Sequence, residues 1–372
     1  MDLHGQIARR FPLIARFRPA CLPLPDRVQT LVALADTAQS TVDQGLASAV
    51  FNQAALIASD VGLPDLAREM CHQHAAAYLH ACPLPAMSAI RALEPVVNLA
   101  RLQIRAGQGD DGRERLLRLY EAVSTGAAAQ FEGVSVPAGL TADLEARREV
   151  RGWLWRVVLA DGARTLTAAG RWAEALHHIE AHRGVGKRML DGRQVAVLAA
   201  LTTGNACSTA TLLADTEPGE PWEQVVTACL TVLCRRAVGR PIDYHLAELV
   251  ISYLDHKPGH GTTVFDIRLG LALLDIICSA DDPAARRIAD DLHRRTVDAN
   301  DGYAAREILA HPLFAALATD QQLQDCRDLV HSCALGNGVL PAGLRGELAD
   351  ALHVGERVIR ISLNASRSLR HA

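Results

Sequence analysis

The sequence predicts an all-α protein with about 14 to 17 helices. Apolar residues recur at spacings of three and four along most of the chain, which places them on one face of a helix. Hydrophobic residues make up 49% of the chain but aromatic residues only 4%, so the apolar mass is mainly Ala, Leu and Val. That composition favours closely packed helices over a β-sandwich. The most strand-like run, Val354 to Leu363, is better explained as the apolar face of a helix.

The clearest pair of helices is expected in residues 160–184. Each half carries a stripe of small or apolar side chains: Ala160, Ala163 and Leu166 in the first, and Ala175, Leu176 and Ile179 in the second. Gly170 stands between the halves, where glycine can leave the right-handed helical conformation without a Cβ penalty. The short connection leaves room only for an antiparallel hairpin.

The spacing of small residues in this hairpin is repeated elsewhere in the chain. Ala163, Gly170 and Ala175 have the same spacing as Ala55, Gly62 and Ala67, and Ala100 with Gly107 forms an imperfect third copy. The pattern resembles the tetratricopeptide repeat, in which small residues lie where paired helices cross. The spacing between Gly170, Gly204 and Gly239 is also close to the repeat length of about 34 residues found in that family. The family's large aromatics and closing Pro are mostly missing.

This resemblance implies an α-solenoid of antiparallel helical hairpins, and a less regular stack of hairpins is the alternative. We expect an irregular basic arm over residues 1–25, where four prolines break any long helix. Residues 26–215 and 216–372 are expected to form the N-terminal and C-terminal halves of one continuous solenoid. Residues 124–139 are expected to be a long loop, and a helix over 344–363 is expected to cap the stack.

Charge and cysteine content exclude several classes of protein. The formal net charge of −4 does not indicate a nucleic-acid partner. No window of about 18 uninterrupted apolar residues predicts a membrane span. In a signal peptide the positive charges precede an apolar run, whereas the N-terminal arginines here follow one. We therefore expect a cytoplasmic protein. The nine cysteines contain no CxxC pair and are expected to be buried free thiols.

The sharpest candidate for chemistry is a row of polar residues on the second helix of this hairpin. Glu174, His178 and His182 are spaced one helical turn apart, so they share a face and can supply two or three metal ligands. The alternative is a solvated polar face opposite the apolar stripe. No outside ligand, nucleotide-binding loop or nucleophile motif is recognisable, and we expect no cofactor.

A candidate partner-binding surface combines arginines with a tryptophan. Arg148 and Arg151 share a helix face with Trp155, and such pairs are common anchors in protein interfaces. His178 is assigned to the same surface, on the expectation that these residues lie near the middle of a concave groove. The alternative is that the arginine stems cover buried indole rings.

These features favour a non-catalytic binding protein that captures a peptide or protein partner in a concave groove. An enzyme or accessory subunit of a peptide-modifying or natural-product pathway is the first alternative, since the Ala-, Arg- and Gly-rich composition resembles that of actinobacterial proteins. A peptide-responsive regulator is the second. An exposed apolar end of the stack would also permit a homodimer.

Overall fold

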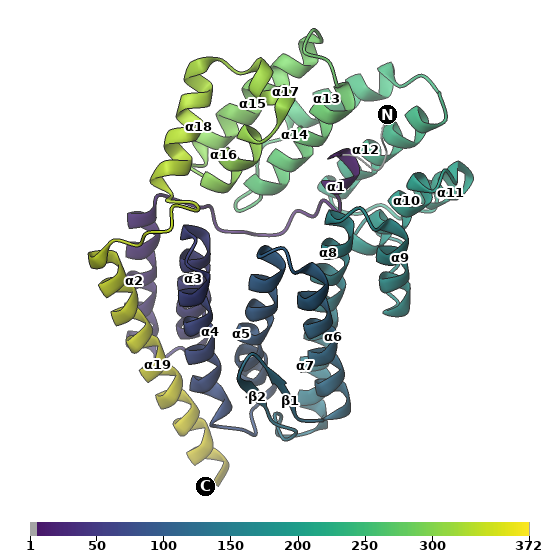
Figure 1. The fold of residues 1–372 in the computed structure, drawn as a ribbon. Helices are drawn as coiled ribbons and strands as arrows, with labels where there is room; N and C mark the ends of the chain where they lie inside the picture. Colours follow the sequence, from purple (N-terminus) through teal and green to yellow (C-terminus); the bar gives the residue numbers. More distant parts are fainter. Residues whose placement is uncertain (1–5, 372) are drawn as a thin grey trace. The chain divides into compact units, whose positions relative to one another are not determined.

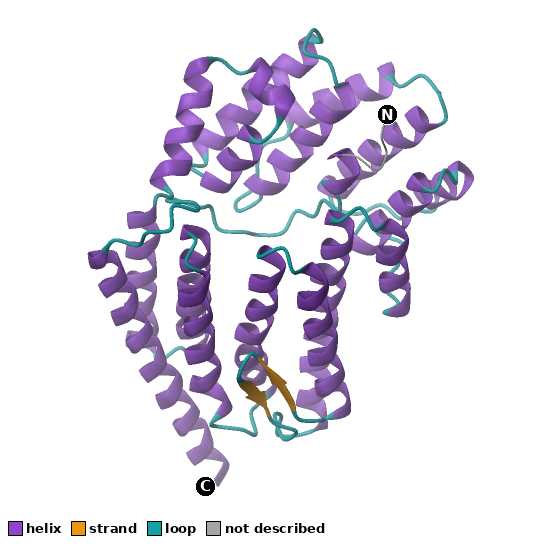
Figure 2. Ribbon diagram, in the orientation of Figure 1, coloured by secondary structure: helices purple, strands orange, loops and turns teal. Residues whose placement is uncertain are grey.

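A computed structural model describes residues 6–371 of the chain, and their regular secondary structure is almost entirely helical (Figure 2). The predicted all-α class is therefore confirmed. The helices are labelled α1 to α19 (Figure 1). They exceed the expected number partly because a short helix lies in the N-terminal arm and because one expected helix is divided into α16 and α17. A solenoid is compatible with this arrangement.

The chain divides into two compact units that are not successive halves of the sequence. Unit 1 comprises the chain up to Leu22 together with Gly162–Cys333, and unit 2 comprises Pro23–Asp161 with the chain from Ala334 onward. The division expected at residue 215 does not coincide with either boundary. Each terminal segment packs within a unit whose other residues lie far from it in sequence, and the sequence contains no local signal for such packing.

Unit 2 contains a stack of antiparallel helices closed by the last helix of the chain. Its α-helices are α2 (Leu24–Thr41), α3 (Gln44–Val61), α4 (Pro64–Leu79), α5 (Ala86–Arg105), α6 (Gly109–Thr125), α7 (Leu144–Val157) and α19 (Ala342–His371), and a π-helical turn, η1 (Val158–Gly162), follows α7 across the unit boundary. The expected turn between α3 and α4 is confirmed, with Gly62 in the left-handed region at φ 94°. The terminal helix α19 packs against α2 and α3 of this unit.

A small β-hairpin replaces part of the loop expected over residues 124–139. Strand β1 (Ala129–Phe131) pairs in antiparallel register with β2 (Val134–Val136). The connecting residues Glu132 and Gly133 both have positive φ, at 45° and 85°, as a tight two-residue hairpin turn requires. The hairpin was not predicted because three-residue strands are too short to show an alternating pattern.

Unit 1 is a second set of paired helices. Its elements are α1 (Gln6–Arg9), α8 (Ala163–Ala168), α9 (Trp172–Ala181), α10 (Asp191–Thr202), α11 (Ala206–Ala214), α12 (Pro221–Ala237), α13 (Asp243–Asp255), α14 (Thr263–Ile277), α15 (Pro283–Asp298), α16 (Gly302–Leu309), α17 (Pro312–Leu317) and α18 (Asp320–Ser332). Gly170, Gly204 and Gly239 end α8, α10 and α12 in the left-handed region, at φ values of 74°, 74° and 69°. The three expected turns are thereby confirmed. Helix α14 is buried along most of its length and packs on α15 and α16.

The N-terminal arm is irregular from Phe11 to Leu22, as expected, but it is an integral part of unit 1. Phe11, Leu13 and Cys21 are almost completely buried. Residues 1–5 lie outside the described part of the chain.

Candidate binding groove

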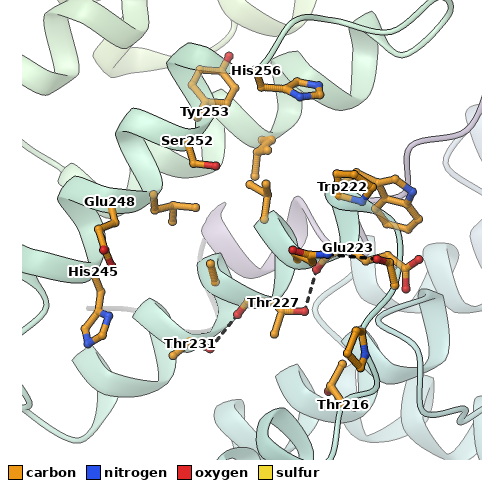
Figure 3. Close-up of a pocket in the computed structure, with 18 of the residues that line it drawn as sticks. Thr216, Trp222, Glu223, Thr227, Thr231, His245, Glu248, Ser252, Tyr253 and His256 are labelled. Carbon is orange, nitrogen blue, oxygen red and sulfur yellow. Dashed lines mark hydrogen bonds between the residues drawn. The ribbon is translucent and has the colours of Figure 1, made fainter.

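Unit 1 contains a groove of about 900 Å³. Helices α12 and α13 form its walls, and the loop before α12 and one side of α14 complete it (Figure 3). A groove of this size can hold several side chains of a polypeptide.

Beyond its first turns, the α12 wall presents small and electrically neutral residues. Thr227, Ala228 and Thr231 line this side of the groove. The hydroxyl groups of the two threonines donate to carbonyl oxygens one turn earlier in the same helix, at 2.7 and 2.8 Å (Figure 3). Because those hydroxyls are already satisfied, the wall offers chiefly methyl groups and lets a ligand backbone approach closely.

An aromatic pair borders the groove at the N-terminal end of α12. The rings of Trp222 and Phe265 meet edge to face, with centroids 5.8 Å apart and planes at 79°. Such pairs contribute about 0.5 to 1.5 kcal/mol beyond the area they bury. Proline at the first position of α12 sets the direction of the helix, so the indole is held in place by local chemistry as well as by packing.

A buried carboxylate anchors the start of α12. Glu223 is 1% exposed and forms a capping box with Glu220. The Arg188 guanidinium donates to Glu223, with Nε 2.9 Å from Oε2, and holds the pKa of that carboxyl below its usual range. Glu217, on the adjoining loop, lies 3.4 Å from the Lys187 ammonium. Both carboxylates are therefore neutralised by basic groups outside the groove lining.

The α13 wall carries carboxylates of a different kind. Glu248 and Asp255 are exposed and line the groove on either side of Ser252. The hydroxyl of Tyr244 donates to Glu248, which raises the pKa of the tyrosine. Among the described residues, no lysine or arginine forms an ion pair with either carboxylate and none lines the groove. The α13 wall therefore presents net negative charge.

The C-terminal end of α13 is held by buried polar groups. Arg295 donates through Nη2 to the carbonyl oxygens of Tyr253 and His256, each at 2.9 Å. His256 Nε2 lies 3.5 Å from Asp266 Oδ1, and burial raises the pKa of Asp266. Arg295 thus satisfies carbonyl groups that a helix end leaves unpaired, and it keeps the exposed face of α13 in a defined position.

The predicted metal row lies on α9, but its members have different environments. Glu174 is exposed and accepts hydrogen bonds from Arg171, including one of 2.8 Å from Nε. His178 is 5% exposed, and a Cβ added to Gly162 would lie 2.5 Å from its Nε2. His182 Nδ1 lies 2.8 Å from the carbonyl oxygen of His178, and the two rings are 4.7 Å apart. Within residues 6–371 no group of three His, Cys, Asp or Glu side chains is arranged to hold a metal ion.

The predicted partner-binding residues are divided between the units. Arg148 and Arg151 are exposed on α7 of unit 2, and Trp155 is half-buried there. The Arg151 guanidinium lies 5.9 Å from the ring centroid of Tyr120 on α6, and its Nε is 3.3 Å from the tyrosine oxygen. His178 is buried in unit 1, so its side chain offers little surface to a partner.

Sequence reasoning missed a buried polar network in unit 2. The Ser48 hydroxyl lies 2.8 Å from His74 Nε2 and 3.1 Å from Glu94 Oε2. His74 stacks on Phe51 with ring centroids 4.9 Å apart, and burial lowers the pKa of His74 to about 3. The network joins α3, α4 and α5. Such a contact between separate helices leaves no local sequence signal.

Comparisons of this chain with protein-family models, curated proteins and solved structures found no match. In the part of the chain that the structure describes, no helix has the length and apolar character needed to cross a membrane. The fold is compatible with a helical-repeat protein.

Proposed function

We propose that this chain is a tetratricopeptide-like binding protein, without catalytic activity, that captures a peptide segment of a partner in the groove between α12 and α13. The observation that carries this proposal is the way unit 1 holds its own N-terminal arm. Residues 11–22 form a segment without helix or strand that is bound by helices and turns from much later in the sequence. Unit 1 is thus a scaffold that already binds one length of non-helical polypeptide.

The main chain of the arm is bound by a buried amide side chain. Gln194 of α10 is 0% exposed and pairs with both polar groups of Leu13. Its Oε1 accepts from the Leu13 N–H at 2.7 Å, and its Nε2 donates to the Leu13 carbonyl at 2.8 Å. This two-way pairing imitates the hydrogen bonds of a β-ladder and does not depend on the side chain of the residue that is bound.

Further main-chain contacts hold the rest of the arm. The Arg18 N–H donates to the carbonyl of Gly261 at 2.9 Å. The Cys21 N–H donates to Asp301 Oδ1 at 3.0 Å, and the Cys21 carbonyl accepts from the Gly302 N–H at 2.8 Å. These contacts come from the turn before α14 and the start of α16. Several elements of unit 1 therefore take part in binding a non-helical segment.

The groove supplies what a second polypeptide segment needs. It has a neutral wall for close backbone approach, an aromatic border for an apolar side chain, and carboxylates that fix orientation. Stacked helical hairpins commonly bind peptides on such surfaces. The binding function rests on these properties of the site and not on a relative of the chain.

Selection from a random peptide library tests this function. Ala228→Arg places a long side chain in the groove from the exposed α12 wall, and Ala247→Arg adds the same side chain to α13 outside the groove lining. We expect peptides selected on the unaltered protein to bind Ala247→Arg and to lose binding to Ala228→Arg. Selected peptides that bind all proteins equally would remove the groove as the site.

The α7 surface is a second partner-binding proposal and is tested in the same selection. Its distinguishing feature is the exposed Arg151 beside Tyr120 of α6. Replacing both Arg151 and Trp155 with alanine removes the charged and aromatic groups together. Unchanged capture of the selected peptides by that variant would exclude α7 from the peptide-binding surface.

A further inference from the structure

We propose that the groove between α12 and α13 selects a basic segment, whose arginine or lysine side chains pair with Glu248 and Asp255 while an apolar side chain packs at the Trp222–Phe265 end. This inference rests on the proposed peptide-binding function and adds the chemical class of the ligand. It follows from the charge of the walls, the spacing of the carboxylates and the way unit 1 binds its own arm.

The charged groups that line the groove, histidines apart, are all acidic. Its lining includes four carboxylates, those of Glu217, Glu223, Glu248 and Asp255, and no lysine or arginine among the described residues. Lys187 and Arg188 neutralise Glu217 and Glu223 from outside the lining. The charge left for a ligand is therefore on α13. An acidic ligand such as a phosphopeptide or a nucleic acid would be repelled by it.

The spacing of the two α13 carboxylates sets the spacing of the ligand's charges. Glu248 and Asp255 are two helical turns apart, which corresponds to about 10 Å along α13. A polyproline II segment returns to the same side after three residues and about 9 Å, and a helix after seven residues and about 10 Å. A ligand with basic residues three or seven positions apart can therefore reach both carboxylates while its backbone lies against Thr227 and Ala228.

Unit 1 already binds an arginine-rich segment in the same chemical manner. Arg10 of the arm pairs with Asp275 of α14, and Arg16 pairs with Asp191 of α10 at 2.5 Å. The Arg18 guanidinium stacks over the ring of Tyr303 on α16, 4.0 Å from its centroid. Carboxylates and an aromatic ring on the helices thus receive cationic side chains from the arm. The groove repeats these two components at Glu248, Asp255 and the aromatic pair.

Fluorescence anisotropy with three labelled peptides tests the proposal on the full chain. The probe is a 14-residue peptide, a length of about 45 Å when extended. It carries one tryptophan and lysines three and seven positions apart, and companion peptides have glutamine or glutamate in place of every lysine. We expect the lysine peptide to bind most tightly and the glutamate peptide not to bind. Raising the salt concentration should weaken the lysine peptide because exposed charges are screened.

Charge-removing variants identify the groups responsible. Glu248→Gln with Asp255→Asn keeps the shape of the wall and removes its charge, and we expect the lysine peptide to bind about 5- to 20-fold more weakly. Glu180→Gln with Asp281→Asn is the matched control, since both carboxylates are exposed in unit 1 outside the groove lining. This control should bind as the unaltered protein does. Thermal unfolding checks that both variants remain folded.

The possible outcomes distinguish selectivity for a basic ligand from peptide binding in the groove as such. If lysine and glutamine peptides bind equally, and binding is lost in Ala228→Arg but not in the charge variant, the groove binds peptides and the basic class is wrong. If no peptide binds, or if Ala228→Arg changes nothing, both the basic class and the groove function are overturned. Preference for the glutamate peptide would also overturn the basic class.

Discussion

Replacing Gln194 with methionine should release the N-terminal arm from unit 1. Methionine has nearly the volume and shape of glutamine but cannot exchange hydrogen bonds with the main chain. The substitution removes the two bonds to Leu13 and a third, of 3.0 Å, from Gln194 Nε2 to the Met189 carbonyl. Because packing is retained, the effect measures the hydrogen bonds rather than a cavity.

The magnitude follows from the groups that are left unpaired. Gln194 and Leu13 are 0% and 1% exposed, so the orphaned N–H and carbonyl groups have little access to water. Each buried main-chain group without a partner costs about 1 to 3 kcal/mol. Two of the three groups, the N–H and carbonyl of Leu13, regain contact with water when the arm opens, so the free energy of opening the arm should fall by about 2 to 6 kcal/mol. That range corresponds to a factor on the order of 10 to 10⁴ in the opening equilibrium.

Hydrogen–deuterium exchange with mass spectrometry measures this local opening directly. Fragments that cover residues 11–22 should lose protection by that factor, and fragments from unit 2 should keep theirs. Gln324→Met is the control, because the Gln324 side chain is exposed on α18 and donates only to Asp328 at 2.8 Å. If the arm of a folded Gln194→Met protein keeps its protection within about threefold, the bonds to Gln194 do not hold it and our reasoning is refuted.

Further predictions concern stability and metal content. Burial lowers the pKa of His74 from 6.5 in the unfolded chain to about 3 in the folded one. Unit 2 should therefore lose stability as the pH falls from 6.5 towards 3, by at most about 1.4 kcal/mol per pH unit. His74→Gln should reduce this slope, measured by urea unfolding between about pH 4 and 7. Gly162→Ala should lower the free energy of unfolding by about 1 to 3 kcal/mol, because the added Cβ would lie 2.5 Å from the His178 ring. Adding His178→Ala should recover part of that stability in thermal unfolding. No recovery would contradict the contact between the two residues. Purified protein should contain no stoichiometric zinc or iron, because His178 is buried against Gly162; a metal that is lost on His182→Ala would contradict this expectation.

Local chemistry in the sequence was sufficient to predict most of the helices and several turns. Gly62, Gly170, Gly204 and Gly239 were each expected to end a helix, and all four adopt the left-handed conformation that glycine allows at no steric cost. These predictions succeed because a helix end depends on a few neighbouring residues. The β-hairpin at residues 129–136 was missed for the complementary reason, since each strand is too short to carry a pattern of its own.

The groove and the surroundings of the α9 residues could not be predicted, because they depend on packing between helices and not on local sequence. The groove was not predicted, because its two walls come from helices whose facing sides are decided only by packing. Glu174, His178 and His182 share a helix face, as their spacing required, yet one is exposed and another is buried. Spacing determines which side chains point the same way, but the neighbouring helices determine which of them meet solvent.

The sequence by itself determined the helical class, the hairpin turns and the absence of a strong net positive charge that would attract nucleic acid. Only the tertiary structure decided that residues 6–22 belong with the helices from Gly162 onward, and that α19 returns to α2 and α3. The physical reason is the range of the interactions. A turn is stabilised by contacts within a few residues, whereas the arm is held by Gln194 and Asp301, whose amide and carboxyl groups act far along the chain from Leu13 and Cys21.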